Sequence, residues 1–460
     1  MKLKRIIRQK MLMVALAAIA TSCTNSYPGL YYDKSNGNSE QQYATAINVS
    51  LSPQNIFSLV ATRGTGSFET SSFAKKCING VFYIYAFRSG KDLQGQFTSD
   101  ADLTQTMGTD SAHANCLVDD NNAYHGKPAK MVADSTGALY FVNDAHTNKQ
   151  SLYYSSNYSQ IPYDFFGYYI DDFTPTASNY HRTNNEIYYD LTVDGAQDVL
   201  VGYAPKLTTN IFNARYGNLD LSEDTKNQII NIGGYSTYAG KYDVQPVIDV
   251  KHALTKIKFA AIAADSTADD VLIRDLSLTG KNSGKLVVAA RDLNNIGFIP
   301  DGKTSTLYLR EASLDGSTPG TLISKEGGYQ VLWNDSLKNI PLASRPSTPI
   351  GESIMLASDS TYTMALDYDM ISRTKQADGT IKEKVEQKVH TTYNIKAPTD
   401  NAVSYDSASG TYIFKPGYEY TIKIAVYGLQ QVKISVSSEA WESGGSINID
   451  VGNEAKKHNI

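Results

Sequence analysis

The stretch Tyr418–Val426 reads YEYTIKIAV, and Val432–Val436, which follows after a short connection containing Gly428, reads VKISV. Apolar and polar side chains alternate strictly in both, which is the period of a strand with one buried face and one wet face. A third alternating run, Ile447, Ile449 and Val451, follows the pair Gly444-Gly445. The end of the chain is therefore predicted to form an antiparallel hairpin and one final strand.

Similar β-rich runs recur toward the N-terminus, separated by polar loops. They are Val81–Phe87, Ala138–Val142, Phe165–Ile170, Val199–Tyr203, Val250–Ala263, Val271–Leu278, Ser353–Ala357, Thr361–Tyr368 and His390–Ile395. Val250–Ala263 is expected to pair with Val271–Leu278. Only Ser222–Ile230 has a helical pattern, with Ser222 as its N-cap. Many short strands between turn residues predict an all-β protein of two β-sandwich domains in series.

A further strand is predicted near the N-terminus. In Ala44–Leu51, the apolar residues Ile47, Val49 and Leu51 alternate with polar ones, and Pro53 ends the run. The polar stretch before it is typical of a flexible tether.

The first 23 residues have the layout of a lipoprotein signal peptide. Met1–Lys10 contains five cationic residues and no acid, Met11–Ala20 is apolar, and small residues precede Cys23. An apolar run of that length spans about 15 Å as a helix, half of a ~30 Å hydrocarbon core, so it is too short for a transmembrane helix. We expect cleavage before Cys23 and acylation of its thiol, which would anchor the chain to a membrane.

Charge excludes one class of partner. Removing residues 1–22 takes away five of the 42 basic side chains and none of the 47 acidic ones, which leaves a net charge of −10. With no basic stripe, the sequence argues against nucleic acid as a partner.

No catalytic or metal-binding motif is found, so the sequence predicts neither an enzyme nor a cofactor. The histidines are scattered, and His252, near the head of a strand, is expected to be structural. Asp119-Asp120 and Asp171-Asp172 could hold calcium, although acid pairs in loops are usually solvated turns. A pair of carboxylates for glycoside hydrolysis is not marked out by any pattern.

Two cysteines remain besides Cys23. Cys77 and Cys116 could form one disulfide in an oxidising compartment, or both could be buried thiols, and the sequence leaves both readings open.

Several segments, in this order along the chain, resemble the fimbrillins, the type V fimbrial subunits of Bacteroidales-like bacteria. They are Cys23, Ala44–Leu51, the loop Ala61–Gly66 with its Arg63, Val81–Phe87, Asp164–Tyr169, Val250–Phe259 and Phe414–Trp441. The resemblance implies two transthyretin-like β-sandwiches, export as a lipoprotein, and polymerisation after a trypsin-like protease cuts behind an arginine. A strand from a neighbouring subunit then fills the groove that the released strand leaves.

Carried over to this sequence, the cleavage falls between Arg63 and Gly64. The released strand contains Ile47, Val49 and Leu51, and the candidate donor strand contains Ile447, Ile449 and Val451. The expected parts are a signal peptide (1–22), a lipidated tether and first strand removed on maturation (23–63), an N-terminal sandwich (64–325) and a C-terminal sandwich (326–460).

The resemblance implies a fimbrium at the cell outer membrane and surface, with other fimbrial subunits, the processing protease and the membrane as partners. Whether the subunit is a stalk, anchor or tip protein stays open. The alternative is a surface lipoprotein or tip adhesin that binds a glycan or a host protein through exposed tyrosines and does not polymerise.

Overall fold

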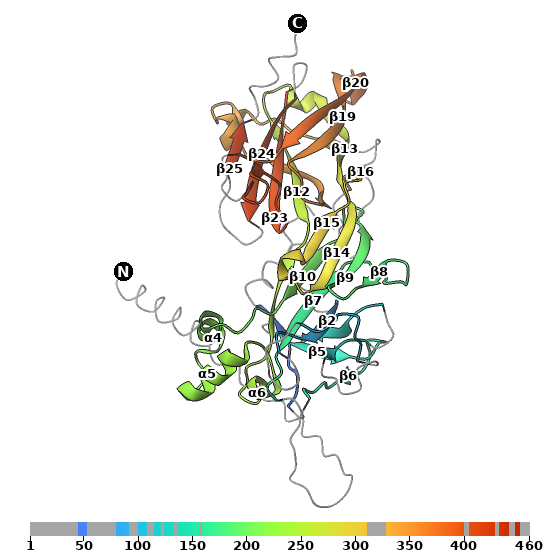
Figure 1. The fold of residues 1–460 in the computed structure, drawn as a ribbon. Coiled ribbons are helices and arrows are strands. Elements are labelled where there is room, and N and C mark those ends of the chain that lie inside the picture. The colour runs from blue at the N-terminus through green and yellow to red at the C-terminus, as the bar shows by residue number, and fades with distance from the viewer. Residues whose placement is uncertain are drawn as a thin grey trace, which may run out of the picture.

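The structure, a computed structural model, is described here for residues 45–52, 80–91, 100–107, 115–120, 124–132, 137–155, 159–310, 328–399, 404–427, 432–440 and 447–450. It is dominated by β-strands, which confirms the predicted all-β class. The strands form two lobes stacked end to end (Figure 1). Among the described residues, no helix is long and apolar enough to cross a membrane.

The first lobe is built on a nine-stranded sheet. Its order is β1 (Ser50–Leu51), β11 (Val247–His252), β10 (Val199–Tyr203), β7 (Tyr163–Ile170), β2 (Val81–Arg88), β4 (Lys127–Met131), β5 (Leu139–Val142) and β6 (Lys149–Gln150), with β3 (Cys116–Val118) beside β2. Neighbouring strands are antiparallel except β1 and β11, which run parallel.

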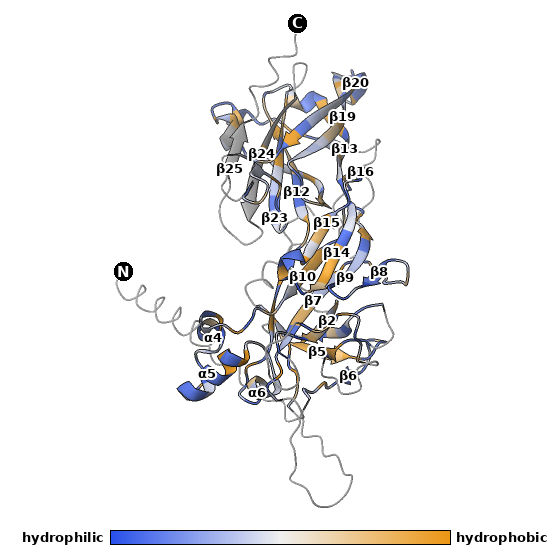
Figure 2. Cartoon of the chain, in the orientation of Figure 1, coloured by the Kyte–Doolittle hydropathy of each residue, from blue (hydrophilic) through white to orange (hydrophobic). Residues whose placement is uncertain are grey.

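A four-stranded sheet covers one face of this large sheet. Its order is β15 (Gly297–Pro300), β14 (Ser283–Ala290), β9 (Glu186–Thr192) and β8 (Tyr180–Arg182). Tyr85 and Tyr168 from the large sheet pack against Tyr189 and Leu286 from the small one. Figure 2 shows the hydrophobic character of β14, whose C-terminal half is buried.

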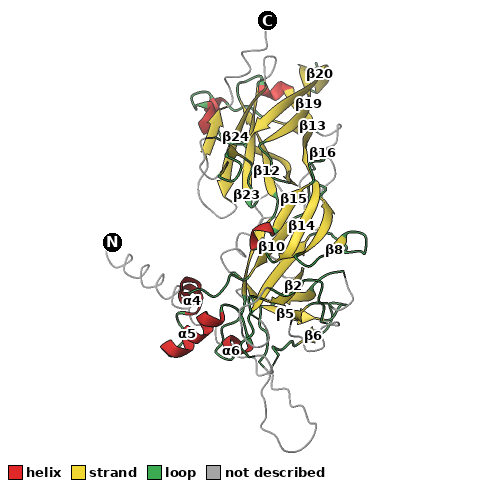
Figure 3. Ribbon diagram, in the orientation of Figure 1, coloured by secondary structure: helices red, strands yellow, loops and turns green. Residues whose placement is uncertain are grey.

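Three short helices lie beside the first lobe, at its outer end (Figure 3). They are α4 (Thr209–Tyr216), α5 (Glu223–Ile232) and α6 (Thr237–Gly240). Phe212 and Ile229 from α4 and α5 join the same core as Ile248 of β11. The Ser222 side chain accepts a hydrogen bond from the Thr225 N–H, which confirms the predicted N-cap.

The second lobe is a sandwich of two sheets around one core. One sheet has the order β18 (Thr348–Leu356), β12 (Thr255–Ala263), β23 (Tyr418–Val426), β24 (Val432–Ala440) and β25 (Ile447–Asp450). The other has the order β16 (Thr304–Tyr308), β13 (Val271–Lys281), β19 (Thr361–Lys375) and β20 (Ile381–Lys396), with β17 (Tyr329–Gln330) beside β13. The remaining elements are the pair β21 (Tyr405–Asp406) and β22 (Thr411–Tyr412), and the short 3-10 helices η2 (Ala268–Asp270), η3 (Leu293–Asn295), η4 (Asp335–Leu337) and η5 (Leu342–Ser344).

The predicted C-terminal hairpin is present as β23 and β24, which pair antiparallel along their full length. Tyr420, Ile422 and Ile424 are fully buried, whereas Thr421 and Lys423 between them are only half-buried. The alternation in the sequence therefore corresponds to the inward and outward faces of β23.

The expected pairing of Val250–Ala263 with Val271–Leu278 is wrong. The first run divides at Ala253 into β11 and β12, and β12 and β13 lie in opposite sheets of the second lobe. After β13 the chain returns to the first lobe as β14 and β15, and β16 lies again in the second lobe. Alternation fixes which face of a strand is buried, but not which strand lies beside it. The division at residues 325 and 326 stays a prediction, and β12, β13 and β16, all before residue 325, lie in the second lobe.

Candidate functional site

The segment of residues 45–52 lies in a slot between two parts of the first lobe. On one side it runs parallel to β11: the Ser50 N–H donates to the Pro246 carbonyl (3.1 Å) and the Ser52 N–H to the Ile248 carbonyl (2.9 Å). The segment therefore continues the ladder of the large sheet beyond β11.

Its other side is bonded as well, to the chain around β5 and β6. The Leu139 N–H donates to the Val49 carbonyl and the Leu51 N–H to the Gly137 carbonyl, both at 2.9 Å. Farther along, the Ile47 N–H donates to the Leu152 carbonyl (2.9 Å). Isolated bridges show that this side is antiparallel. Segment 45–52 is thus an inserted strand with neighbours on both sides, rather than an edge strand.

The alternation predicted for this segment is confirmed by burial. Ile47, Val49 and Leu51 expose only 4%, 3% and 0% of their surface, whereas Asn48 is exposed. The three apolar side chains belong to the core that Ile248 and the helices share. The predicted released strand is therefore anchored by three buried side chains, and its release stays a prediction.

A glutamine that the sequence analysis missed also contacts the segment. The Gln245 side-chain amide donates to the Ala46 carbonyl (3.0 Å) and accepts from the Asn48 N–H (3.2 Å). Nothing in the sequence marks Gln245 except its position before Pro246, directly ahead of β11.

The C-terminal candidate strand is bonded on one side. β25 pairs antiparallel with β24, with Ile449 opposite Val436 and Ile447 opposite Ser438. β25 ends the order of its sheet, so within the described part of the chain β24 is its neighbour in that sheet. Val451 lies outside the described residues, and the donor role of this strand stays a prediction.

The remaining predicted processing residues are not placed. Cys23, Arg63 and Gly64 all lie outside the described residues. Cys116 is described and fully buried, with its Sγ 3.9 Å from Asp119 Oδ2. Since Cys77 also lies outside the described residues, the question of a disulfide stays open.

The acid pairs considered for calcium have protein partners. Arg182 forms a 2.8 Å ion pair with buried Asp119, and the Tyr169 hydroxyl donates to Asp171 (3.1 Å). Burial raises the pKa of Asp119, although the Arg182 charge opposes the shift. Across the described ranges, no three His, Cys, Asp or Glu side chains are arranged to hold a metal ion.

His252 is buried and hydrogen-bonded, as the sequence predicts. Its Nδ1 lies 2.9 Å from Asp198 Oδ1, where the chain leaves β11 of the first lobe and enters β12 of the second. Lys256, two residues into β12 and fully buried, forms a 3.1 Å ion pair with Glu419 of β23. Removal of one partner from either pair would leave an uncompensated polar group buried where the lobes join, which destabilises a protein.

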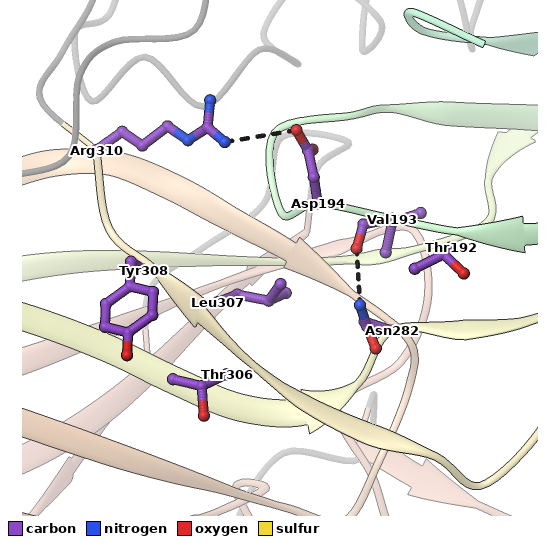
Figure 4. A pocket seen from close by; sticks show the side chains of 8 residues that line it. All are labelled: Thr192, Val193, Asp194, Asn282, Thr306, Leu307, Tyr308 and Arg310. Carbon is purple, nitrogen blue, oxygen red and sulfur yellow. Dashed lines mark hydrogen bonds and ion pairs between the residues drawn. The ribbon is translucent and has the colours of Figure 1, made fainter. Parts of the chain in front are cut away.

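A pocket of about 430 Å³ lies where the end of β9 meets β16 (Figure 4). Its residues are Thr192, Val193, Asp194, Asn282, Thr306, Leu307, Tyr308 and Arg310. Arg310 and Asp194 form a 3.5 Å ion pair on one side of it, and Tyr308 is 48% exposed. Asn282 is held by its amide, which donates to the Val193 carbonyl (3.0 Å).

No protein-family model and no curated protein matches the chain. Solved structures similar to it include a proposed cell adhesion protein from Bacteroides uniformis, with 12% identity, coverage of 88% of this chain and 100% of that one, and a TM-score of 0.39. A tip fimbrial protein from Porphyromonas gingivalis has 9% identity, coverage of 85% and 99%, and a TM-score of 0.31. A fimbrial anchor protein from the same organism has 8% identity, coverage of 86% and 98%, and a TM-score of 0.28.

These are fimbrial and cell adhesion proteins, the class that the sequence motifs resemble. All three TM-scores lie below 0.5, so these similarities assign neither a family nor a function to this chain.

Proposed function

We propose that this chain is a structural subunit of a cell-surface fimbria with a role in adhesion. It would be exported as a lipoprotein, anchored at the outer membrane through Cys23, and polymerised by strand exchange after a trypsin-like protease cuts behind Arg63. The observation that supports this proposal is the inserted strand of residues 45–52, which is bonded on both sides and buries Ile47, Val49 and Leu51.

The position of Arg63 in the chain connects the inserted strand to the proposed cleavage. Arg63 follows the inserted strand and precedes every other described strand. A cut there leaves residues 45–52 held by non-covalent contacts alone. The cut strand can then diffuse away and be replaced, whereas an uncut strand stays tethered to the slot and competes with any replacement.

An empty slot would be costly, and this cost drives replacement. Each apolar side chain removed from water contributes roughly 1.5–3 kcal/mol, and each main-chain hydrogen bond about 0.5–1.5 kcal/mol. Losing the segment exposes three apolar sites and two rows of unpaired backbone groups. A strand with the same alternation from another subunit restores both kinds of contact, and Ile447, Ile449 and Val451 have that alternation.

Limited cleavage of the full chain tests this function. After treatment with a trypsin-like protease, we expect a new N-terminus at Gly64 by mass spectrometry and a ladder of oligomers on gels run without boiling. The variant Arg63→Ala is the matched control and should give neither. Cleavage at Arg63 that yields only monomers would contradict the proposal.

The lipid anchor has its own test. Cys23→Ala should leave unprocessed or soluble protein that incorporates no labelled fatty acid. Incorporation of label into this variant would show that Cys23 is not the acylated residue.

A second candidate function is a glycan- or protein-binding surface lipoprotein, or tip adhesin, that does not polymerise. The pocket between the end of β9 and β16 favours it. An exposed tyrosine ring can pack on the apolar face of a sugar, and the hydroxyl, amide and charged groups beside it can bond the sugar hydroxyls. Tyr308→Ala should then abolish binding on a glycan array. Tyr405→Ala, which removes a similarly exposed ring elsewhere in the second lobe, should retain binding.

A further inference from the structure

The parallel ladder between the inserted strand and β11 is interrupted at Pro246. In a regular ladder, the residue at this place would donate its N–H to the neighbouring strand, but proline has no N–H. The Pro246 carbonyl still accepts from the Ser50 N–H, so the ladder holds from residue 50 onward. Residues 45–49 therefore need another hydrogen-bond partner on the side that faces β11.

The Gln245 side chain supplies that partner. Its Nε2 donates to the Ala46 carbonyl (3.0 Å), and its Oε1 accepts from the Asn48 N–H (3.2 Å). In a parallel ladder, the peptide groups opposite Ile47 would make this same pair of bonds to the residues before and after it. Continued from Ser50 and Val247, the register places Val244 opposite Ile47, but the Val244 N–H donates to the Ala239 carbonyl (3.1 Å). The Gln245 side-chain amide makes this pair of bonds in place of the Val244 peptide groups.

Neighbouring side chains hold Gln245 in this position. The Tyr216 hydroxyl donates to the Gln245 main-chain carbonyl (2.5 Å), and the Tyr154 hydroxyl lies 3.4 Å from Oε1. Gly240 leaves the necessary space, because a Cβ there would come within 2.9 Å of Thr45 and 3.3 Å of Gln245 Nε2. The amide is thus held at both its backbone and its tip by tyrosines that lie outside the inserted strand.

We propose that Gln245 is a positioning residue that clamps the backbone of whichever strand occupies the slot. This inference rests on the proposed function. The two bonds go only to main-chain atoms, so Gln245 recognises an extended backbone and not a particular side chain. The partner it fits is an extended strand from a second subunit, with apolar residues at the three positions that Ile47, Val49 and Leu51 now fill. The register itself is set by the side chains, because a slip by one residue would turn these three apolar positions away from the core.

Hydrogen exchange of the uncleaved, full-length chain tests the clamp directly. In Gln245→Leu, which keeps the volume but removes both bonds, the Asn48 amide should exchange about tenfold faster, as expected for one lost hydrogen bond. The Leu51 amide, bonded to Gly137 on the other side of the slot, should keep its rate. Equal acceleration at both amides would mean general loosening, and an unchanged Asn48 rate would mean no clamp; either result overturns the proposal.

A second variant separates hydrogen bonding from packing. Gln245→Glu, measured near neutral pH, keeps an acceptor for the Asn48 N–H but loses the donor to Ala46. The Asn48 amide should therefore stay protected in Gln245→Glu and lose protection in Gln245→Leu. Matching acceleration in both variants would overturn the assigned bonding.

These measurements do not depend on polymerisation. If the cleaved wild-type chain gives no oligomer ladder while Asn48 responds as described, the proposed function fails and the local role of Gln245 stands. If the ladder forms in Gln245→Leu with the same yield and resistance to unfolding as in the wild type, the clamp has no part in assembly and the proposal is overturned.

Discussion

The first and last described strands of this chain resemble each other in sequence and differ in their surroundings. Residues 45–52 and 447–450 both place isoleucine or another apolar residue at every second position. The first segment is bonded on both sides and crosses the core of its lobe. The last strand, β25, is bonded to β24 and ends the order of its sheet.

One sequence pattern therefore occurs in two different structural settings. An inserted strand fills a space that its own lobe cannot close by other means, so its loss leaves two open edges. A strand that ends a sheet can leave after breaking a single ladder, and the sheet behind it keeps its other pairs. Strand exchange needs one of each: a slot that must be filled and a strand that can leave at low cost.

The largest expected effect is at the centre of the inserted strand. Val49→Asp puts an unpaired carboxylate into the core and should destabilise the uncleaved chain by about 3–5 kcal/mol, as measured by urea unfolding. Asn48→Asp, on the exposed side of the same strand, should change stability by less than about 0.5 kcal/mol. Equal effects at the two positions would show that the segment is not held in a slot.

The next effect is expected at the other strand and concerns assembly. Ile449→Asp should block oligomer formation by the cleaved chain, because the donor strand would then carry a charge into the slot, while circular dichroism still shows a folded monomer. Normal assembly of this variant would exclude the C-terminal strand as donor. Unfolding of the variant would instead show that β25 belongs to the core of its own lobe.

The smallest expected effect is a pH dependence of stability that differs between the two lobes. Burial and the nearby Asp144 raise the pKa of Asp120, in the first lobe, to about 6, against the opposing charges of His125 and Lys127. The unfolded value is about 3.9, so the protonated carboxyl stabilises the fold fully below about pH 4, and this contribution is lost as pH rises through about 6. Asp120→Asn should therefore raise the melting temperature at pH 7.5 and leave it unchanged at pH 4. An identical shift at both pH values would contradict this assignment.

Glu419 in the second lobe should respond in the opposite direction. Burial opposes its charge, yet Lys256 and Lys258 hold the pKa of Glu419 below its usual range. Its contribution is therefore present above the unfolded pKa of about 4.3 and is lost only as pH falls below it. Glu419→Gln should therefore lower the melting temperature at pH 7.5 and lower it less at pH 3, and an equal loss at both pH values would contradict this assignment.

The faces of the strands could be predicted from the sequence, because alternation follows directly from strand geometry. Val49 and Ile422 are buried where the pattern places them inward. Strand partners could not be predicted in the same way. β12 runs parallel to β23, more than 150 residues later, and no local pattern records such a pairing.

The slot illustrates the same limit. The strand that fills the slot could be predicted from the alternation of Ile47, Val49 and Leu51. The residues that bond to it on either side lie far away in the chain. Gln245 looks like any polar residue ahead of a strand, and its role depends on the Val244 N–H being bonded to Ala239 and on Ala46 lying within reach of the side-chain amide. Only the folded chain brings these features together.

The central claim is that the inserted strand is exchangeable once the chain is cut behind Arg63. It is tested most directly by native size-exclusion chromatography of the cleaved protein, with mass spectrometry of each fraction to locate the fragment that contains residues 45–52. We predict that the fragment is released as a free peptide as oligomers form, and that the oligomer fractions contain chains beginning at Gly64 without it. A fragment that stays in equal amount with the cleaved chain in every fraction, monomer and oligomer alike, would contradict the account.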